Sequence, residues 1–219
     1  ASAFRQVQGR QYDGVVVVGF THREPFDGVS VDTRESYETP LGLIPVDHAA
    51  VEFLQAFSPV KAGQRLPPAV RHEERAHAAV EHSLEVMLPF LQVALGEFRL
   101  VPILVGEVSI EETERLAEAL AELSQRGDYL FVFSTDLSHY HPYETAVEID
   151  QRTVEALLHE TPQAVARLFS YGHIEACGRG PILTSLWLSA KLGYLRKELL
   201  RDENSGDTAG DRSRVVGYA

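Results

Sequence analysis

The sequence predicts an α/β fold: a single domain in which helices flank both faces of a mostly parallel central sheet. Residues 15–20, Val-Val-Val-Val-Gly-Phe, form a β-branched run without a polar break, as expected for a parallel strand covered on both faces. Residues 99–105 and 128–133 repeat this pattern. Helical patterns lie between these runs, and strands that alternate with helices are typical of a parallel sheet between helix layers.

The helices between and after the strands are predicted from their start signals. Ser109 and Glu112 form a capping box, in which each side chain accepts a backbone N–H at the helix start. Thr161 caps another helix, whose first position is Pro162. Pro89 is expected to kink a long apolar helix, because proline removes a backbone donor. The predicted helices span 47–57 with Asp47 as the cap, 81–97, 109–125, 143–159, a segment that begins at 161, and 181–191.

The last quarter of the chain predicts two further strands and a loop. Residues 195–200 and 214–218 are predicted to add terminal strands. Residues 201–211 between them are polar and glycine-rich, which predicts a mobile loop. No internal repeat, low-complexity tract or linker divides the chain, so one domain is expected.

Composition and charge narrow the classes of function. Hydrophobic residues make up 44% of the chain, enough for a sizeable core. The formal net charge is −12, which repels nucleic acids and anionic membrane surfaces and argues against a nucleic acid function. The apolar runs are too short to span a bilayer, and no signal peptide is visible. Cys177 is the single cysteine, so no intrachain disulfide can form, and a reducing, cytoplasmic location is expected.

Polar side chains follow two of the predicted strands. His22 comes directly after the first strand, and Asp136 and His139 follow the strand that ends at Phe133. In open α/β sheets, ligands bind beyond the carboxyl ends of the strands. Two such ends with a histidine, one of them also with an aspartate, therefore predict a pocket at this edge.

His82 and Glu85 are candidates for the same pocket. They lie three residues apart, so a helix places them on one face. Two interpretations remain open: a polar pair at the edge of the core, or a pair of pocket residues. A buried His–Glu pair needs partners that offset its desolvation, and a pocket supplies them.

Cys177 lies in a glycine-rich turn, Cys-Gly-Arg-Gly-Pro, just before a predicted helix. Exposed N–H groups at a helix start stabilise a thiolate, which is the form that binds metals and attacks electrophiles. The alternative is an inert buried thiol, since free cysteine is among the most buried residue types. The turn favours a functional role, because burial of a thiol does not require it. His22, His82, Asp136, His139 and Cys177 are thus predicted to form one metal-binding pocket.

Five ordered motifs resemble the Memo-like family, whose bacterial and archaeal members are called AmmeMemoRadiSam system protein B. The motifs extend over nearly the whole chain, and the family is related in fold to class III extradiol ring-cleaving dioxygenases. They are residues 18–22 (VGFTH), 81–85 (EHSLE) with 88–90 (LPF), 101–106 (VPILVG), 134–140 (STDLSHY) and 177–182 (CGRGPI).

The resemblance implies roles for most of the candidate residues. The family's metal site has two histidines and one cysteine, with an aspartate and a further histidine beside it. His22 and Cys177 would then be metal ligands, and Asp136 and His139 would line the open side. In the related dioxygenases a histidine matching His139 serves as a base. His82 and Glu85 would be neighbouring pocket residues.

Two departures from the family accompany this resemblance. The family's first ligand lies in a His-Ala-Gly-Tyr segment that this sequence does not contain, and residues 1–7 match the helix that follows that segment. Residues 1–219 are therefore expected to form a Memo-like domain that lacks its N-terminal segment. Arg23 stands where many relatives carry a second histidine. Together with Arg179 it would favour an anionic ligand.

Three functions remain open, with metal-dependent redox chemistry ranked first. Two histidines and an anionic third ligand leave coordination positions free, as in Fe(II) sites that activate O₂, and a thiolate also admits Cu or Zn. The second function is a binding module for an anionic peptide or a small metabolite. The third is a metal-free cysteine enzyme with Cys177 as nucleophile, His139 as base and Asp136 as its orienting group. The resemblance also implies a functional link to radical-SAM and AMMECR-like proteins.

Overall fold

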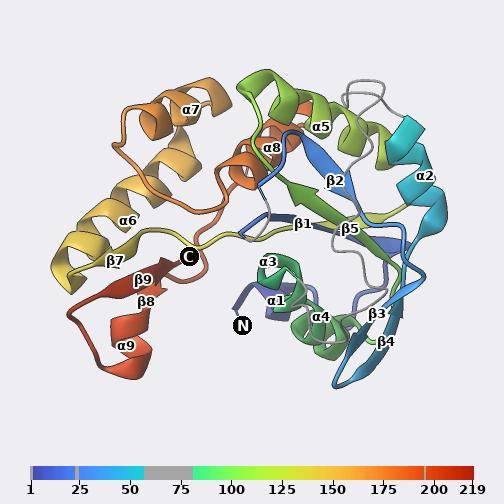
Figure 1. Cartoon of the computed structure of the whole chain (residues 1–219), viewed down its shortest axis with the longest axis horizontal. Coiled ribbons are helices and arrows are strands. Elements are labelled where there is room, and N and C mark those ends of the chain that lie inside the picture. Colours follow the sequence, from blue (N-terminus) through green and yellow to red (C-terminus); the bar gives the residue numbers. More distant parts are fainter. Residues whose placement is uncertain (1, 23–24, 57–80, 195) are drawn as a thin grey trace.

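The computed structural model describes residues 2–22, 25–56, 81–194 and 196–219, and its centre is a four-stranded sheet in the order β2-β5-β1-β6 (Figure 1). β1 (Gly14–Phe20) lies in the interior of the sheet and pairs in parallel with β5 (Leu100–Val105) and β6 (Tyr129–Phe133). β2 (Val29–Val31) adds an antiparallel edge. The mostly parallel sheet predicted from the three apolar runs is confirmed.

The central strand is inaccessible on both faces. Val15, Val16, Val17 and Val18 are all 0% exposed, and every residue of β5 is buried. Full burial of a valine side chain contributes about 1.5–3 kcal/mol, so each of these four residues adds to the apolar stabilisation of the core.

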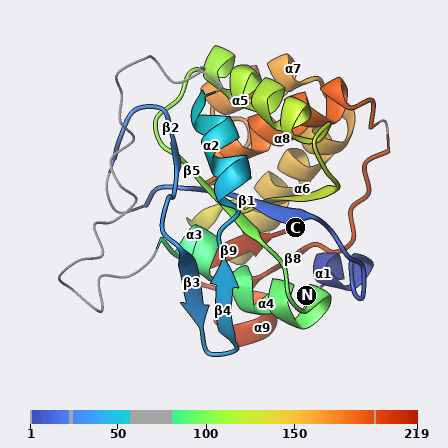
Figure 2. The same cartoon turned by 90° about the vertical axis from the view of Figure 1, so that its right-hand side faces the viewer.

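Helices cover both faces of the sheet (Figures 1 and 2). On one face, α5 (Ile110–Leu123) packs against α8 (Arg179–Lys191) and α2 (His48–Ala56), and α8 contacts β1 and β6. On the other face, α3 (His82–Glu85) contacts β1 and α4, and α1 packs against α4. The bounds of the last two helices are Ser2–Gln6 for α1 and Leu88–Leu95 for α4.

Smaller elements flank this sandwich. A hairpin of β3 (Ser36–Thr39) and β4 (Gly42–Pro45) lies beside α2 and α4 in Figure 2. On the side where β6 ends, α7 packs on α8, and α6 contacts a three-stranded sheet in the order β7-β9-β8. These elements are α6 (Tyr143–His159), α7 (Pro162–Ser170), β7 (His139–His141), β8 (Glu203–Asn204), α9 (Ser205–Ala209) and β9 (Val215–Tyr218).

The predicted caps are confirmed. Asp47 Oδ1 accepts the Ala50 N–H at 3.1 Å, so Asp47 caps α2. Ser109 and Glu112 form the predicted capping box of α5. Thr161 accepts the Ala164 N–H at 3.3 Å at the start of α7. No helix among the described residues has the length and apolar composition needed to cross a membrane.

The long helix predicted over 81–97 is wrong. Two helices stand there, α3 and α4, with Met87 as the N-cap of α4 and Pro89 in its first turn. Proline is tolerated in a first turn because the backbone N–H groups of that turn have no intrahelical acceptor, so the missing N–H breaks no hydrogen bond. Pro89 therefore begins a helix rather than kinking one. The last predicted helix also begins earlier, at Arg179 instead of Pro181.

Two predictions near the end of the chain are wrong as well. Residues 196–200 form no strand, and Leu195 lies outside the described residues. The segment 201–211, predicted as a mobile loop, contains β8 and α9. Asn204 and Asp207 form a capping box at the start of α9, and Gly210 ends it with a left-handed φ of 82°. The terminal strand predicted at 214–218 is confirmed as β9, although it pairs antiparallel outside the main sheet.

Candidate metal centre

The candidate residues gather where neighbouring strands end. β1 leads to His22, and β6 leads to the segment 134–139, whose first N–H (Ser134) donates to the Val18 carbonyl at 2.8 Å. The start of α8 lies over the same edge, because a Cβ at Gly180 would meet Val105, the last residue of β5, at 2.7 Å. The predicted location at the carboxyl edge of the sheet therefore holds for His22, Asp136, His139 and Cys177.

Cys177 is joined to the end of β6 by backbone hydrogen bonds. The Asp136 N–H donates to Cys177 Sγ at 3.1 Å, and the Cys177 N–H donates to the Asp136 carbonyl at 3.1 Å. The Gly178 N–H donates to Thr135 Oγ1 at 2.9 Å. A Cβ at Gly178 would lie 2.8 Å from Thr135, so only glycine allows this approach without a shift of the chain. The glycine-rich turn thus brings the thiol to the strand end.

The pKa of Cys177 lies above its ordinary value. Burial raises this pKa, and hydrogen bonds from the Asp136 N–H and from Thr135 offset the rise only in part. Cys177 does lie immediately before Gly178, the N-cap of α8, as predicted. The expectation that the helix start yields a thiolate is wrong for the metal-free protein, because desolvation outweighs the N–H groups.

Asp136, His139 and Cys177 form the first cluster of candidate ligands. One donor atom from each lies within 4.8 Å of the other two. His139 Nδ1 lies 2.9 Å from the Leu137 carbonyl, which can only accept, so Nδ1 carries the proton and Nε2 keeps its lone pair. Nε2 in turn lies 3.9 Å from Asp136 Oδ2. The cluster presents a thiol, a carboxylate and an imidazole nitrogen that can accept a cation.

The loop that carries His139 is fixed by the end of the chain. The Leu137 N–H donates to the Gly217 carbonyl, and the Gly217 N–H donates to the Ser138 carbonyl, both at 2.9 Å. Next to His139, Tyr140 has a φ of 62°, and the pairing of β7 with β9 shifts register there. A tyrosine in the left-handed region is strained, and such strain is found preferentially at functional sites. The bulge helps set the direction of the His139 side chain.

His22, Glu81 and His82 form a second cluster, again with one donor atom each within 4.8 Å. His22 Nδ1 lies 2.7 Å from Glu81 Oε1, and the His22 backbone N–H donates to Glu81 Oε2 at 2.8 Å. His82 Nδ1 lies 3.2 Å from Glu81 Oε1. Burial alone would raise the pKa of Glu81, but the hydrogen bonds from His22 bring it below its ordinary value. His22 and His82 thus share a buried carboxylate, and His22 and Cys177 fall in separate clusters.

Glu81 is the functional candidate that the sequence analysis missed. Glu85, the predicted partner of His82, is exposed on α3, whereas Glu81 is 5% exposed. Glu81 is the N-cap of α3, and Leu84, three residues after it, is buried. The glutamate buried at this end of the helix is therefore Glu81 and not Glu85.

A hollow of about 380 Å³ opens beside the first cluster. His139, Cys177 and Arg179 line it together with Glu175 and the ring of Phe169. The Arg179 guanidinium lies 5.9 Å from the Phe169 ring centroid and donates to Ser170 Oγ at 3.0 Å. Arg179 therefore lines the same hollow as His139 and Cys177. Arg23, the other predicted anion contact, lies outside the described residues.

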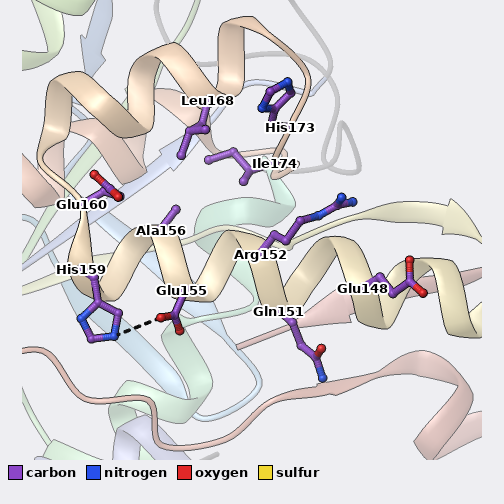
Figure 3. Close-up of a pocket in the computed structure, with 10 residues that line it drawn as sticks. All are labelled: Glu148, Gln151, Arg152, Glu155, Ala156, His159, Glu160, Leu168, His173 and Ile174. Carbon is purple, nitrogen blue, oxygen red and sulfur yellow. Dashed lines mark ion pairs between the residues drawn. The ribbon is translucent and has the colours of Figure 1, made fainter.

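A second hollow, of about 700 Å³, lies over α6 and does not include the candidate ligands (Figure 3). Its histidines, His159 and His173, are exposed, and His159 pairs with Glu155 at 3.6 Å. Glutamates, Arg152 and apolar residues complete the lining. These two histidines therefore lie apart from the candidate ligands.

Comparisons with known proteins agree with the fold and with the motifs. The family model described as Memo-like protein matches residues 1–219. A MEMO1 family protein from Ignicoccus hospitalis is 36% identical over 208 residues, which cover 94% of this chain and 70% of that protein. One from Methanosarcina barkeri is 37% identical over 211 residues, covering 94% and 74%.

A solved structure supports the fold alone. The crystal structure of an uncharacterized protein, JW3007 from Escherichia coli K12, matches with a TM-score of 0.58 at 16% identity and covers 99% of this chain and 91% of that one. The family rests on the family model, which matches residues 1–219, and on relatives that cover 94% of this chain. This chain belongs to the Memo-like protein family.

Proposed function

We propose that this protein binds a transition metal at the carboxyl edge of its sheet and uses it for redox chemistry on a small or anionic ligand. The observation that carries the proposal is the first cluster, where donor atoms of Asp136, His139 and Cys177 lie within 4.8 Å of one another. A thiolate, an imidazole and a carboxylate form a mixed donor set that suits Fe(II) first, with Cu or Zn as alternatives.

The chemistry of these side chains fits a cation. The Cys177 thiol is protonated in the metal-free protein because burial raises its pKa. A metal ion would take the place of that proton, so loading releases protons and strengthens as the pH rises. Both His22 and His139 donate Nδ1–H to a protein acceptor, which leaves Nε2 of each ring free. Metal-ligating histidines almost always have such a partner on the second nitrogen.

Each residue has a defined task in this proposal. Cys177 and His139 of the first cluster would hold the metal, together with His22, the ligand that the family resemblance implies. Asp136, whose Oδ2 lies 3.9 Å from His139 Nε2, would complete the donor set. Arg179 binds an anionic group of the ligand at the rim of the 380 Å³ hollow. A bound iron or copper ion supplies the one-electron chemistry that side chains lack.

Elemental analysis of protein purified with and without air tests the proposal. We expect close to one equivalent of iron or copper per chain, and a loss of most of it in Cys177→Ala and His139→Ala. Zinc alone would support metal binding but refute the redox chemistry, because Zn²⁺ does not change its oxidation state. His159→Ala is the matched control, because His159 is exposed and lines the other hollow. Absence of metal from all preparations, after incubation with each of the three ions, would refute the proposal.

A binding function without chemistry is the second candidate, and Arg179 favours it. Its exposed guanidinium and the Phe169 ring lie on one hollow, which suits an anionic group attached to an apolar one. Arg179→Ala should then weaken binding of an anionic ligand in metal-free and metal-loaded protein alike. If metal removal alone abolishes ligand binding, the redox proposal is preferred.

The geometry disfavours a metal-free cysteine enzyme. His139 donates Nδ1–H to the Leu137 carbonyl, and Asp136 lies near Nε2, the nitrogen that would have to accept the thiol proton. The raised pKa of Cys177 also reduces the fraction of thiolate, the reactive form.

A further inference from the structure

Glu81 belongs to none of the predicted ligand sets, yet it makes several contacts to the candidate site. It is a buried carboxylate at the N-cap of α3, a helix of four residues. Its cap bond, from the Ser83 N–H to Oε1, is 3.3 Å long. Its two contacts to His22 are much shorter, at 2.7 and 2.8 Å. The stronger interactions of Glu81 therefore lie with the end of β1 and not with its own helix.

The two oxygens of Glu81 hold His22 at two points. Oε2 accepts the backbone N–H and Oε1 faces ring Nδ1, so the carboxylate fixes both the main chain and the side chain of one residue. An ionised carboxylate can only accept, which places the His22 proton on Nδ1 and leaves the lone pair on Nε2.

The rings of Phe20 and His82 restrict the same imidazole. Each ring centroid lies 3.9 Å from that of His22, at interplanar angles of 51° and 35°. The His82 ring is itself held near Glu81 Oε1, at 3.2 Å from Nδ1. Ser83, which follows, donates from Oγ to the Phe20 carbonyl at 2.9 Å and seats α3 on β1. Residues 81–83 thus contact the end of β1 through a carboxylate, a ring and a hydroxyl.

We propose that Glu81 is the positioning residue of the site: it holds His22 as the Nδ1–H tautomer and turns Nε2 into the only nitrogen of that ring able to bind a metal or accept a proton. The effect on metal affinity rests on the proposed function, whereas the tautomer does not. Partners of this kind typically change metal affinity 10–100-fold, about the range we expect here.

The tautomer is measured on the metal-free protein by ¹⁵N NMR of the imidazole rings, with His22→Gln to assign its signals. In the unmodified protein we expect Nδ1 protonated and Nε2 unprotonated. In Glu81→Gln the amide cannot accept from both the backbone N–H and the ring, so we expect mixed tautomers. In Glu81→Ala the Nε2–H form, favoured by free imidazole side chains, should dominate. Glu52→Gln, an exposed glutamate on α2, is the matched control and should leave the signals unchanged.

Metal titration of the same proteins separates the two proposals. The expected dissociation constant rises about 10–100-fold in Glu81→Ala and stays unchanged in Glu52→Gln. A protein that binds no metal but shows the expected tautomers refutes the proposed function and supports the positioning role. A His22 ring that is Nε2–H in the unmodified protein, or stays Nδ1–H in both Glu81 variants, overturns the positioning role whatever the metal does. Since Glu81→Gln preserves the volume of the side chain, the test does not depend on whether Glu81→Ala folds.

Discussion

Gly19 and Ser83 offer a direct test of how closely α3 is seated on β1. A Cβ at Gly19 would lie 2.4 Å from Ser83 Oγ and 3.1 Å from both Ser83 Cβ and Leu84 Cδ2. The same Ser83 Oγ donates to the Phe20 carbonyl at 2.9 Å. One oxygen atom therefore both excludes a methyl group from position 19 and joins the helix to the strand.

The sizes of the two effects can be set against each other. Gly19→Ala should destabilise by about 1–3 kcal/mol through overpacking, of which about 0.4–1 kcal/mol is offset by a less flexible unfolded chain. Ser83→Ala removes the bond to Phe20, worth about 0.5–1.5 kcal/mol. In the double variant the new methyl group occupies the space that Oγ vacates. The contacts to the Cβ of residue 83 and to Leu84 Cδ2 remain, so the double variant should be less stable than Ser83→Ala but more stable than the sum of the two single effects, with a coupling of about 0.5–2 kcal/mol.

Urea unfolding of the four proteins, followed by far-UV circular dichroism and by fluorescence of Trp187, measures this coupling. Gly19→Ala combined with Ser124→Ala is the control, because Ser124 also donates to a backbone carbonyl but at the end of α5. That pair should be additive within about 0.5 kcal/mol. Equal additivity for Gly19→Ala and Ser83→Ala would show that α3 is not seated on β1 as described.

Three further predictions concern single residues. Asp150 is 2% exposed and burial raises its pKa, so the free energy of unfolding should fall as the pH rises through the folded-state pKa. Asp150→Asn keeps an oxygen for the Ser138 N–H and should remove this slope, whereas parallel pH profiles of the two proteins would contradict the prediction. Iodoacetamide labelling of Cys177 in metal-free protein should have its midpoint at a higher pH than a free thiol, and a midpoint at or below that value would refute the description of its surroundings. Thr135→Ala removes the acceptor of the Gly178 N–H and the donor to the Asp136 carbonyl, so it should lower the free energy of unfolding in urea by about 1–3 kcal/mol and lower the metal content. Thr135→Ser should resemble the unmodified protein, and equal loss of stability in both variants would exclude the hydroxyl as the cause.

The sheet and the loop of Cys177 could be predicted because each depends on a local signal. Three apolar runs specify the parallel strands, and the two in the interior of the sheet, β1 and β5, are buried as this pattern predicts, whereas the edge strand β6 is partly exposed at every position. The glycine-rich turn at Cys177 was identifiable because Gly178 allows a backbone approach that a side chain would block. In both cases neighbouring residues along the chain carry the information.

The role of Glu81 and the structure of 201–211 could not be found in the same way. Glu81 interacts with His22, 59 positions away, and a single long helix assigned to 81–97 directed attention to Glu85 instead. Residues 201–211 looked like a loop because their polar composition outweighed a capping box in a helix of five residues. The direction of His139 depends on β9, about 80 positions further along, which no local pattern specifies.

The pairing of the His139 loop with β9 also fixes the order in which the site can form. Synthesis delivers β1, β6 and the Cys177 turn before residues 215–218, so a chain that stops short of them has every candidate donor but lacks the bonds from Gly217 to Leu137 and Ser138. The loop that carries His139 can therefore take its final position only after residues 215–218 have been made.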